Sequence, residues 1–275
     1  GHHLYDEPGV ADLIRAAREA GDRLATYCQP DGEFVCDLPE WELGKTEGSS
    51  AADQAIAVMA LCRLFRATTE ARYKDAATRA AARLCGFIRP YGVAPRAGCI
   101  PERQAADDPN GIMEPRHITS LSTNALAAVA LCEAATMNQS EEYHPALGML
   151  ARHLMAQVQP DGDMVSERDF PSLRLRPRID PESTAVAVLA FTYLYEVAAR
   201  PIYLSHAETV GARLRSSVLE RNAMESLPRN VWLLESLDRL FTFTRDRSLD
   251  TTIQRLGLAA LLEQTREVDF PDLYG

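Results

Sequence analysis

An internal repeat constrains this chain more than any other feature of its sequence. The tetrapeptide Gln-Pro-Asp-Gly at 29–32 recurs at 159–162, and an Ala-rich apolar run starts 26 residues after each copy, at Ala55 and at Ala185. A third copy starts as Arg-Pro-Tyr-Gly at 89–92. Because two independent landmarks keep one spacing, the chain is predicted to consist of tandem copies of one structural unit.

Each unit begins with a segment whose apolar residues recur at steps of three and four. In the second unit these residues are Tyr73, Ala77, Ala80, Leu84 and Phe87, with charged residues between them. This spacing predicts an amphipathic helix that covers a core from outside. A proline then ends the helix, because its ring removes a backbone donor and clashes with the preceding turn. The glycine two residues later permits the turn.

These outer helices also end alike. A basic residue followed by leucine stands at the same place in four of them: Arg23-Leu24, Arg83-Leu84, His153-Leu154 and Arg213-Leu214. The histidine is the variant of a position that is otherwise arginine. The shared ending supports one common unit.

The second helix of each unit has a different pattern. Its consecutive apolar residues surround the helix on all sides, so this inner helix is predicted to be buried, and residues suited to N-capping precede it. Alternation of outer wet and inner dry helices predicts a ring or solenoid of hairpins. Outer helices are expected at 9–28, 70–88, 141–158, 202–220 and 249–265, and inner helices at 50–67, 118–137, 182–199 and 229–245.

The predicted fold class is all-α, an (α/α) toroid or an incomplete α/α barrel of tandem hairpins with about nine long helices. The chain resembles the six-hairpin glycosidase-like proteins and their terpenoid-cyclase-like relatives. The resemblance lies in the alternation of inner and outer helices and in the turns at 29–34 and 159–164. It spans nearly the whole chain, implies a helical ring, and assigns no catalytic residue, since one fold hosts many activities.

Length and charge bound the remaining possibilities. Residues 4–275 are expected to form one domain, whole or a piece of a longer protein, while residues 1–3 are typical of an expression-tag remnant. With 39 acidic and 29 basic residues the formal net charge is −10, which disfavours nucleic acid or an anionic membrane as a partner. No apolar run is long enough to cross a bilayer. A cytoplasmic protein is expected, unless a natural N-terminus outside this sequence carries a signal.

The long connections within the units mark the expected site. They cover about 30–48, 89–117, 160–181 and 221–228, whereas the connections between units are short. Alternate connections of a hairpin ring emerge at the same end, and long loops are often functional. The face that bears the long loops is therefore the predicted site.

These loops supply carboxylates and arginines. Paired carboxylates cleave or rearrange sugars, one as acid and the other as base or nucleophile, while arginines and helix N-termini bind anionic groups. The candidate catalytic residues are Asp107, Asp108, Glu114, Asp180 and Glu182. The candidate substrate-binding residues are Trp41, Tyr91, Arg116, His117, Arg178, Arg229 and Asn230. The alternatives are that the arginines only pair with loop acids and that the two aromatic residues only fix their loops in place.

No motif predicts a metal ion or a cofactor. No Cys/His set has metal-ligand spacing, and Asp107-Asp108 does not complete the D-x-D-D motif of the cyclases. The first hypothesis is thus a carbohydrate-active enzyme (hydrolase, lyase or epimerase) that acts on a saccharide, neutral or acidic, by carboxylate acid/base chemistry. The alternative is a non-catalytic binding or scaffold domain of a larger protein. An isoprenoid cyclase or transferase is disfavoured by the missing motifs.

The apolar stripe of the last predicted outer helix indicates that another segment or chain packs against it. Its apolar stripe includes Leu249, Ile253 and Leu256, and no inner helix follows it in this chain. A missing segment, a second copy of the chain or the helix at 9–28 is expected to cover 249–265. The expected ligand is a saccharide or another small molecule.

Overall fold

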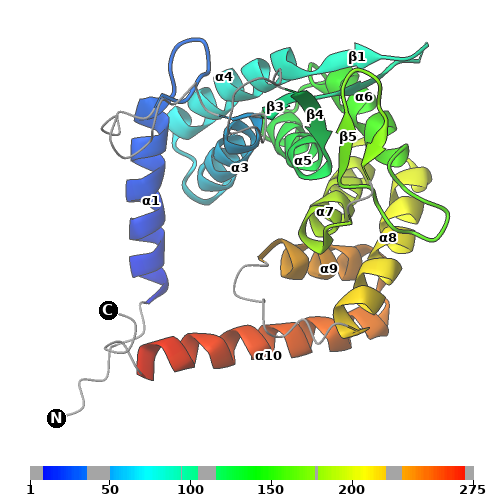
Figure 1. The fold of residues 1–275 in the computed structure, drawn as a ribbon. Coiled ribbons are helices and arrows are strands. Elements are labelled where there is room, and N and C mark those ends of the chain that lie inside the picture. The colour runs from blue at the N-terminus through cyan, green and yellow to red at the C-terminus, as the bar shows by residue number, and fades with distance from the viewer. Residues whose placement is uncertain are drawn as a thin grey trace, which may run out of the picture. The chain divides into compact units, whose positions relative to one another are not determined.

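The chain divides into two compact parts, each larger than one hairpin of the repeat. Residues 1–87 with 130–144 form the first part, and residues 88–129 with 145–275 form the second. The division passes through helix α5 (Leu121–Asn138). A computed structural model describes residues 9–35, 50–93, 95–104, 116–176, 179–220 and 231–269 (Figure 1).

The helices in these ranges follow the predicted alternation, and each predicted helix is present. The outer helices are α1 (Val10–Tyr27), α4 (Ala71–Phe87), α6 (His144–Met155), α8 (Pro201–Glu220) and α10 (Arg247–Asp269). The inner helices are α3 (Ala51–Thr68), α5, α7 (Pro181–Ala198) and α9 (Val231–Thr244). No helix of the described residues is long and apolar enough to span a membrane.

Burial separates the inner helices α5 and α7 from the outer helices, as predicted, but the prediction is wrong for α9, which buries only the stripe Leu233, Ser236, Leu237 and Leu240. In α7 every residue from Ser183 to Leu194 is buried, and the middle of α5 is buried on all sides. In α4 only a stripe is buried, which includes Tyr73, Ala80 and Leu84. Inner helices of small residues therefore form the core, because alanine lets neighbouring backbones approach closely.

The Pro-Asp-Gly turns have nearly identical geometry, which confirms the repeat. In the first, the Gln29 amide donates to the Glu33 carbonyl over 2.8 Å, and in the third the Gln159 amide donates to the Asp163 carbonyl over 2.8 Å. Gly32 and Gly162 adopt φ angles of 86° and 87°, a left-handed region that glycine reaches without strain. A Cβ atom at Gly32 would lie 2.3 Å from the Arg79 carbonyl oxygen.

The basic residue near the end of α4, α6 and α8 holds the turn of the hairpin before it. Arg83 pairs with Asp31 and Glu33 over 2.7 Å each, and Arg213 pairs with Asp163 over 2.7 Å. His153, the variant, hydrogen-bonds Tyr91 in the middle turn. The shared helix ending in the sequence is thus a clamp between successive units.

Two small sheets occupy the second and third long connections, where the sequence predicted only loops. Strands β1 (Arg89–Tyr91) and β2 (Ala97–Cys99) form a hairpin. Strands β3 (Glu102–Gln104), β4 (Arg116–Ser120), β5 (Glu167–Asp169) and β6 (Leu175–Arg176) form an antiparallel sheet in that order (Figure 1). Pairing of β4 with β5 joins the two connections at one end of the unit. The predicted shared face is confirmed for these two, while 36–49 and 221–230 lie outside the described residues.

Helix α10 packs its apolar stripe on α9. Leu249 and Leu256 are buried and Ile253 is half-buried, whereas Leu258 is exposed. Side chains from 259 onward lie outside the described residues. The expectation that a further segment or copy covers 249–265 stays a prediction.

Candidate functional site

The four-stranded sheet gathers three carboxylates on one face. Glu102 pairs in register with Ile118, and Ile118 pairs with Asp169. Ser120, two residues along β4, pairs with Glu167. Residues directly opposite one another point to the same side of a sheet, as do residues two apart on one strand. Glu102, Glu167 and Asp169 therefore share one side, which we call the carboxylate face.

Hydroxyl groups hold the first of these carboxylates. An oxygen of Glu102 accepts a hydrogen bond of 3.3 Å from the Ser120 hydroxyl and another from the Thr123 hydroxyl. Thr123 lies in the first turn of α5. The Glu102 carboxylate is thus fixed at the N-terminus of an inner helix, where the helix dipole favours negative charge.

The guanidinium of Arg176 lies beside the carboxylates of both Glu167 and Asp169. One guanidinium nitrogen of Arg176 lies 2.7 Å from a carboxylate oxygen of Asp169, and another lies 3.8 Å from an oxygen of Glu167. All three side chains are more than half buried, Glu167 the most. The carboxylate face therefore combines acids in two different settings, one bonded to hydroxyls and two beside a cation.

A single serine connects the sheet to two inner helices. The Ser166 carbonyl accepts from the amide of Leu121, the first residue of α5, over 2.7 Å. The Ser166 hydroxyl accepts from the amide of Asp180, the N-cap of α7, over 2.9 Å. The N-termini of α5 and α7 and the start of β5 consequently meet at one place, beside the carboxylate face.

A buried relay of side chains anchors the opposite face of the sheet. Arg168 lies between Glu167 and Asp169 on β5 and donates to the Gln157 side-chain oxygen over 2.5 Å and to the Ala156 carbonyl over 2.6 Å. A guanidinium only donates, so the Gln157 amide nitrogen is left to donate to Nε2 of His153, 3.2 Å away. Neutral His153 then carries its proton on Nδ1 and donates to the Tyr91 hydroxyl over 2.7 Å.

Burial keeps the relay uncharged apart from its arginine. Burial, helped by the charge on Arg168, lowers the pKa of His153 to about 3. Burial also raises the pKa of Tyr91 to about 12. Both groups are neutral near pH 7, so the relay fixes β1 and β5 to α6 by hydrogen bonds between neutral groups. The Tyr91 hydroxyl thus fixes its loop to α6, and stacking of the Tyr91 ring on a sugar stays a prediction.

The remaining predicted site residues have varied surroundings. Asp180 caps α7 and accepts from the amides of Glu182 and Ser183 over 3.4 and 3.0 Å. Glu182 is exposed in the first turn of α7, and His117 is exposed on β4. Arg116 begins β4, but its side chain is not described. Outside the described residues lie Trp41, Asp107, Asp108, Glu114, Arg178, Arg229 and Asn230.

Sequence reasoning did not select Glu102, Glu167 or Asp169. A signal existed, since Glu167-Arg168-Asp169 alternates acid, base and acid with the two-residue period of a strand. Three residues are too few to distinguish a strand from an acidic loop. Among the described residues no group of three His, Cys, Asp or Glu side chains could hold a metal ion.

Comparison with solved structures places the fold. A D-mannose isomerase is similar with a TM-score of 0.65 at 14% identity, over 93% of this chain and 71% of that one. The cellobiose 2-epimerase of Spirochaeta thermophila gives 0.61 at 15% identity, over 94% and 72%. An α-mannanase of glycoside hydrolase family 76 from Bacteroides thetaiotaomicron gives 0.59 at 11% identity, over 79% and 58%.

These likenesses concern the fold. The sequence matches no protein-family model and no curated protein. The chain spans 58% of the length of the mannanase that it resembles. The chain shares its fold with these proteins, a repeat of (α/α) hairpins, as the sequence predicted.

Proposed function

We propose that this chain is a carbohydrate-active enzyme whose site is the carboxylate face beside the N-termini of α5 and α7. One observation carries the proposal: Glu102, Glu167 and Asp169 share one face of the sheet. Similar folds belong to proteins named as an isomerase, an epimerase and a mannanase of sugars. The shared architecture supports a saccharide as the ligand of this chain.

The carboxylate face fits acid/base chemistry at a glycosidic or anomeric carbon. Such chemistry needs two carboxylates in different environments, one to donate a proton and one to accept it or to attack. The Glu102 carboxylate accepts a hydrogen bond from the Ser120 hydroxyl, and Ser120 lies directly opposite Glu167 on the neighbouring strand. Opposed residues have Cβ atoms about 4.5–5.5 Å apart. We assign Glu102 and Glu167 as the two carboxylates of this chemistry.

The residues predicted from sequence extend this site. Asp107, Asp108 and Glu114 lie in the chain between β3 and β4, directly after the strand of Glu102. They remain proposed catalytic groups, together with Glu182 in the first turn of α7. For Asp180 we propose a supporting role, because its carboxylate already accepts hydrogen bonds from the start of α7.

An acidic sugar is the proposed substrate class within this function. Arg116, Arg178 and Arg229 each stand just before an inner helix in the sequence, and an arginine fork binds a carboxylate bidentately. Contacts of this kind contribute about 1.5–3 kcal/mol. Replacing Arg116 with alanine is therefore expected to weaken binding of glucuronate at least tenfold while binding of neutral glucose is unchanged.

Turnover of saccharides tests the proposal. The wild-type chain and the Glu102→Gln and Glu167→Gln variants are incubated with neutral and uronate oligosaccharides, and products are identified by mass spectrometry. We expect the wild type to form product and each variant to lose at least a hundredfold in rate. Glu196→Gln, at the far end of α7 and paired with Arg239, is the matched control. Equal rates in all four proteins would contradict the assignment.

A non-catalytic binding or scaffold domain is the second candidate. The observation that favours it is the pairing of Arg176 with two loop acids, which is the saturation expected of a purely structural charge network. This alternative predicts that no saccharide is changed by the wild-type chain.

A further inference from the structure

The first helix carries a groove with no occupant among the described residues. Its volume is about 420 Å³. Arg23, at its rim, is exposed, and no carboxylate of the described part of the chain pairs with it. We call this surface the α1 groove, and its lining residues are Ala16, Glu19, Ala20, Arg23, Leu24 and Tyr27.

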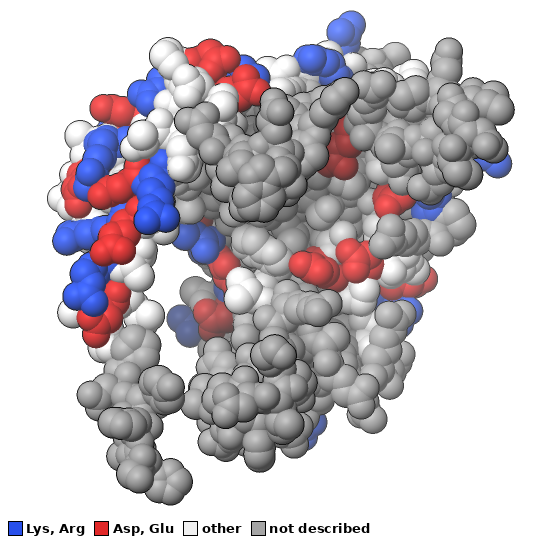
Figure 2. All heavy atoms as spheres, turned by 60° about the vertical axis from the view of Figure 1, so that its left-hand side comes forward, with Lys and Arg blue, Asp and Glu red and all other residues white. Residues whose placement is uncertain are grey.

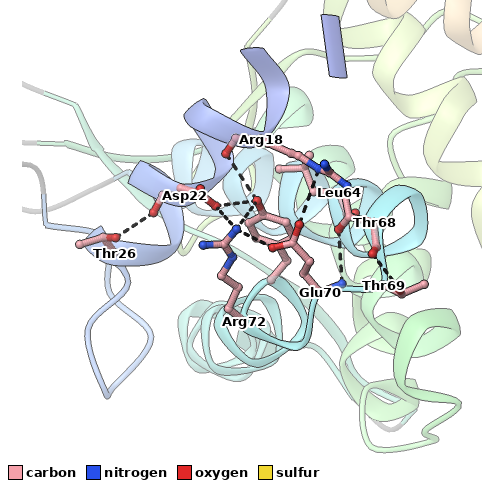
Figure 3. A network of polar contacts seen from close by, with 9 residues as sticks. Arg18, Asp22, Thr26, Leu64, Thr68, Thr69, Glu70 and Arg72 are labelled. Carbon is pink, nitrogen blue, oxygen red and sulfur yellow. Dashed lines mark hydrogen bonds and ion pairs between the residues drawn. The ribbon is translucent and has the colours of Figure 1, made fainter. Parts of the chain in front are cut away.

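The opposite side of α1 is the side that anchors it. Asp22 accepts from Arg72 over 2.8 Å and from the Tyr73 hydroxyl over 2.6 Å, and Arg18 lies 3.6 Å from Glu70 (Figure 3). At 3.6 residues per turn, positions 18 and 22 are on the far side of the helix from 16, 20 and 23. The α1 groove is therefore a second face, separate from the contacts that hold the helix in place.

Each lining residue of the groove has a counterpart on α4. Aligning Arg23-Leu24 with Arg83-Leu84 matches the lining set, in order, with Ala76, Arg79, Ala80, Arg83, Leu84 and Phe87. On α4 this face receives the turn at 29–34. Arg83 pairs with Asp31 and Glu33, and the Arg79 side chain donates to the Gln29 carbonyl. The backbone at Gly32 lies directly on that of Arg79.

The exposure of its lining residues shows that no turn covers the α1 groove among the described residues. Ala76, Ala80 and Leu84 of α4 are buried, whereas the corresponding Ala16 and Ala20 are exposed. The same arrangement recurs between the turn at 159–162 and α8, where Arg213 of α8 pairs with Asp163 and Gly162 lies on the Thr209 backbone. Both described Gln-Pro-Asp-Gly turns are thus seated on the next basic-Leu helix ending, whereas nothing lies within 4 Å of the Cβ position of Gly92 in the middle turn.

We propose that the α1 groove is a docking site for a further polypeptide turn that shares Pro-Asp-Gly-acid with the two seated turns but starts with a basic residue. Arg23 takes the acid that follows the glycine, and the small side chain of Ala20 admits the glycine backbone. Glu19 stands at the place of Arg79, which on α4 donates to the Gln29 backbone carbonyl. A carboxylate cannot donate to that carbonyl, so a first residue whose cationic side chain pairs with Glu19, such as arginine, is favoured over glutamine.

The charge of this surface fits such a partner. The charged residues of α1 are Asp12, Arg15, Arg18, Glu19, Asp22 and Arg23, so both signs are mixed along the helix, and Figure 2 shows basic and acidic side chains interspersed. A nucleic acid or an anionic lipid surface needs clustered basic residues. A turn with one basic and two acidic residues matches the mixed pattern. The proposal does not depend on the saccharide site.

A tethered turn tests the docking site. A heptapeptide is placed before residue 9 of the full chain, and its sequence is Arg-Pro-Asp-Gly-Asp-Met-Val. A flexible Gly/Ser linker of about 15 residues connects the two, which gives the tethered turn an effective concentration of the order of millimolar at the α1 groove. The readout is the rate at which maleimide modifies the thiol of an Ala16→Cys variant, located by mass spectrometry. Ala11→Cys, on the same helix outside the groove, is the matched control.

The proposal predicts that the tethered turn slows modification at position 16 at least fivefold and leaves position 11 unchanged. Arg23→Ala, or asparagine in place of both turn aspartates, should restore the original rate. Unchanged rates at position 16, or equal protection by the asparagine turn, would overturn the proposal. Protection without any tether that grows with protein concentration would assign the groove to a second copy of the chain and overturn it as well.

Discussion

At the scale of single residues, His153 shows how one substitution within a repeat changes a contact. In the other described units an arginine clamps an acidic turn by an ion pair. With histidine at this place and Tyr91 in the turn, the clamp becomes a hydrogen bond between two neutral groups, buried His153 and half-buried Tyr91. The sequence revealed the variant position, but not the relay through Gln157 to Arg168, because those residues meet only in the folded unit.

The low pKa of His153 makes part of the stability pH-dependent. Its folded value of about 3 lies below the ordinary value of about 6.5, so the unfolded chain takes up the proton first as the pH falls. The contribution is complete above about pH 6.5 and is lost progressively below it. Between pH 7 and pH 5.5 we expect His153 to account for a loss of about 1 kcal/mol in unfolding free energy.

Urea unfolding of the wild type and a His153→Gln variant at both pH values measures this contribution. The variant should lose less stability than the wild type over the interval. His206, whose pKa burial also lowers, remains in both proteins and cancels in the comparison. Identical pH dependence in the two proteins would show that His153 is already protonated or is solvated in the folded state.

At the scale of elements, long helices were predictable and short strands were not. A helix such as α7 repeats its pattern over 18 residues, which is long enough to fix its period. Strands β3 and β5 have three residues each, and they exist because β4 pairs with both. Register between distant segments decides that Glu102 and Asp169 share a face, and no local pattern encodes it.

The turn glycines offer a graded test of the repeat. Gly32→Ala should destabilise the fold by about 2 kcal/mol or more, because a positive φ is combined with a backbone clash at 2.3 Å. Gly92→Ala, with positive φ but open space, should cost about 1 kcal/mol. Gly86→Ala, inside α4 with nothing near its Cβ position, should stabilise slightly. Thermal unfolding that gives any other order would contradict the turn geometry.

The inner helices allow a second test at this scale. Ala127 of α5 is fully buried, so Ala127→Leu adds volume to a close-packed core and should cost about 1–3 kcal/mol in unfolding free energy. Ala57→Leu in α3 should act in the same direction. Ala67→Leu, at an exposed position of α3, is the control and should change stability by less than about 0.5 kcal/mol. Denaturant titration that finds all three equal would show that these helices are not interior.

At the scale of the whole molecule, the architecture is recognisable from the sequence while the activity is not. Alternating wet and dry helices with Pro-Asp-Gly turns predicted the hairpin repeat, and similar solved structures confirm it. The same fold hosts different reactions on different sugars, so the site has to be read from side chains. Here the carboxylate face, which the sequence did not single out, carries the functional proposal.

A crystal structure of the chain soaked with a uronate-containing oligosaccharide tests that central claim most directly. We expect sugar density against the carboxylates of Glu102 and Glu167, beside the N-termini of α5 and α7, with the sheet otherwise unchanged. Saccharide bound elsewhere with the carboxylate face empty, or no bound saccharide at concentrations well above those that saturate binding in solution, would contradict it.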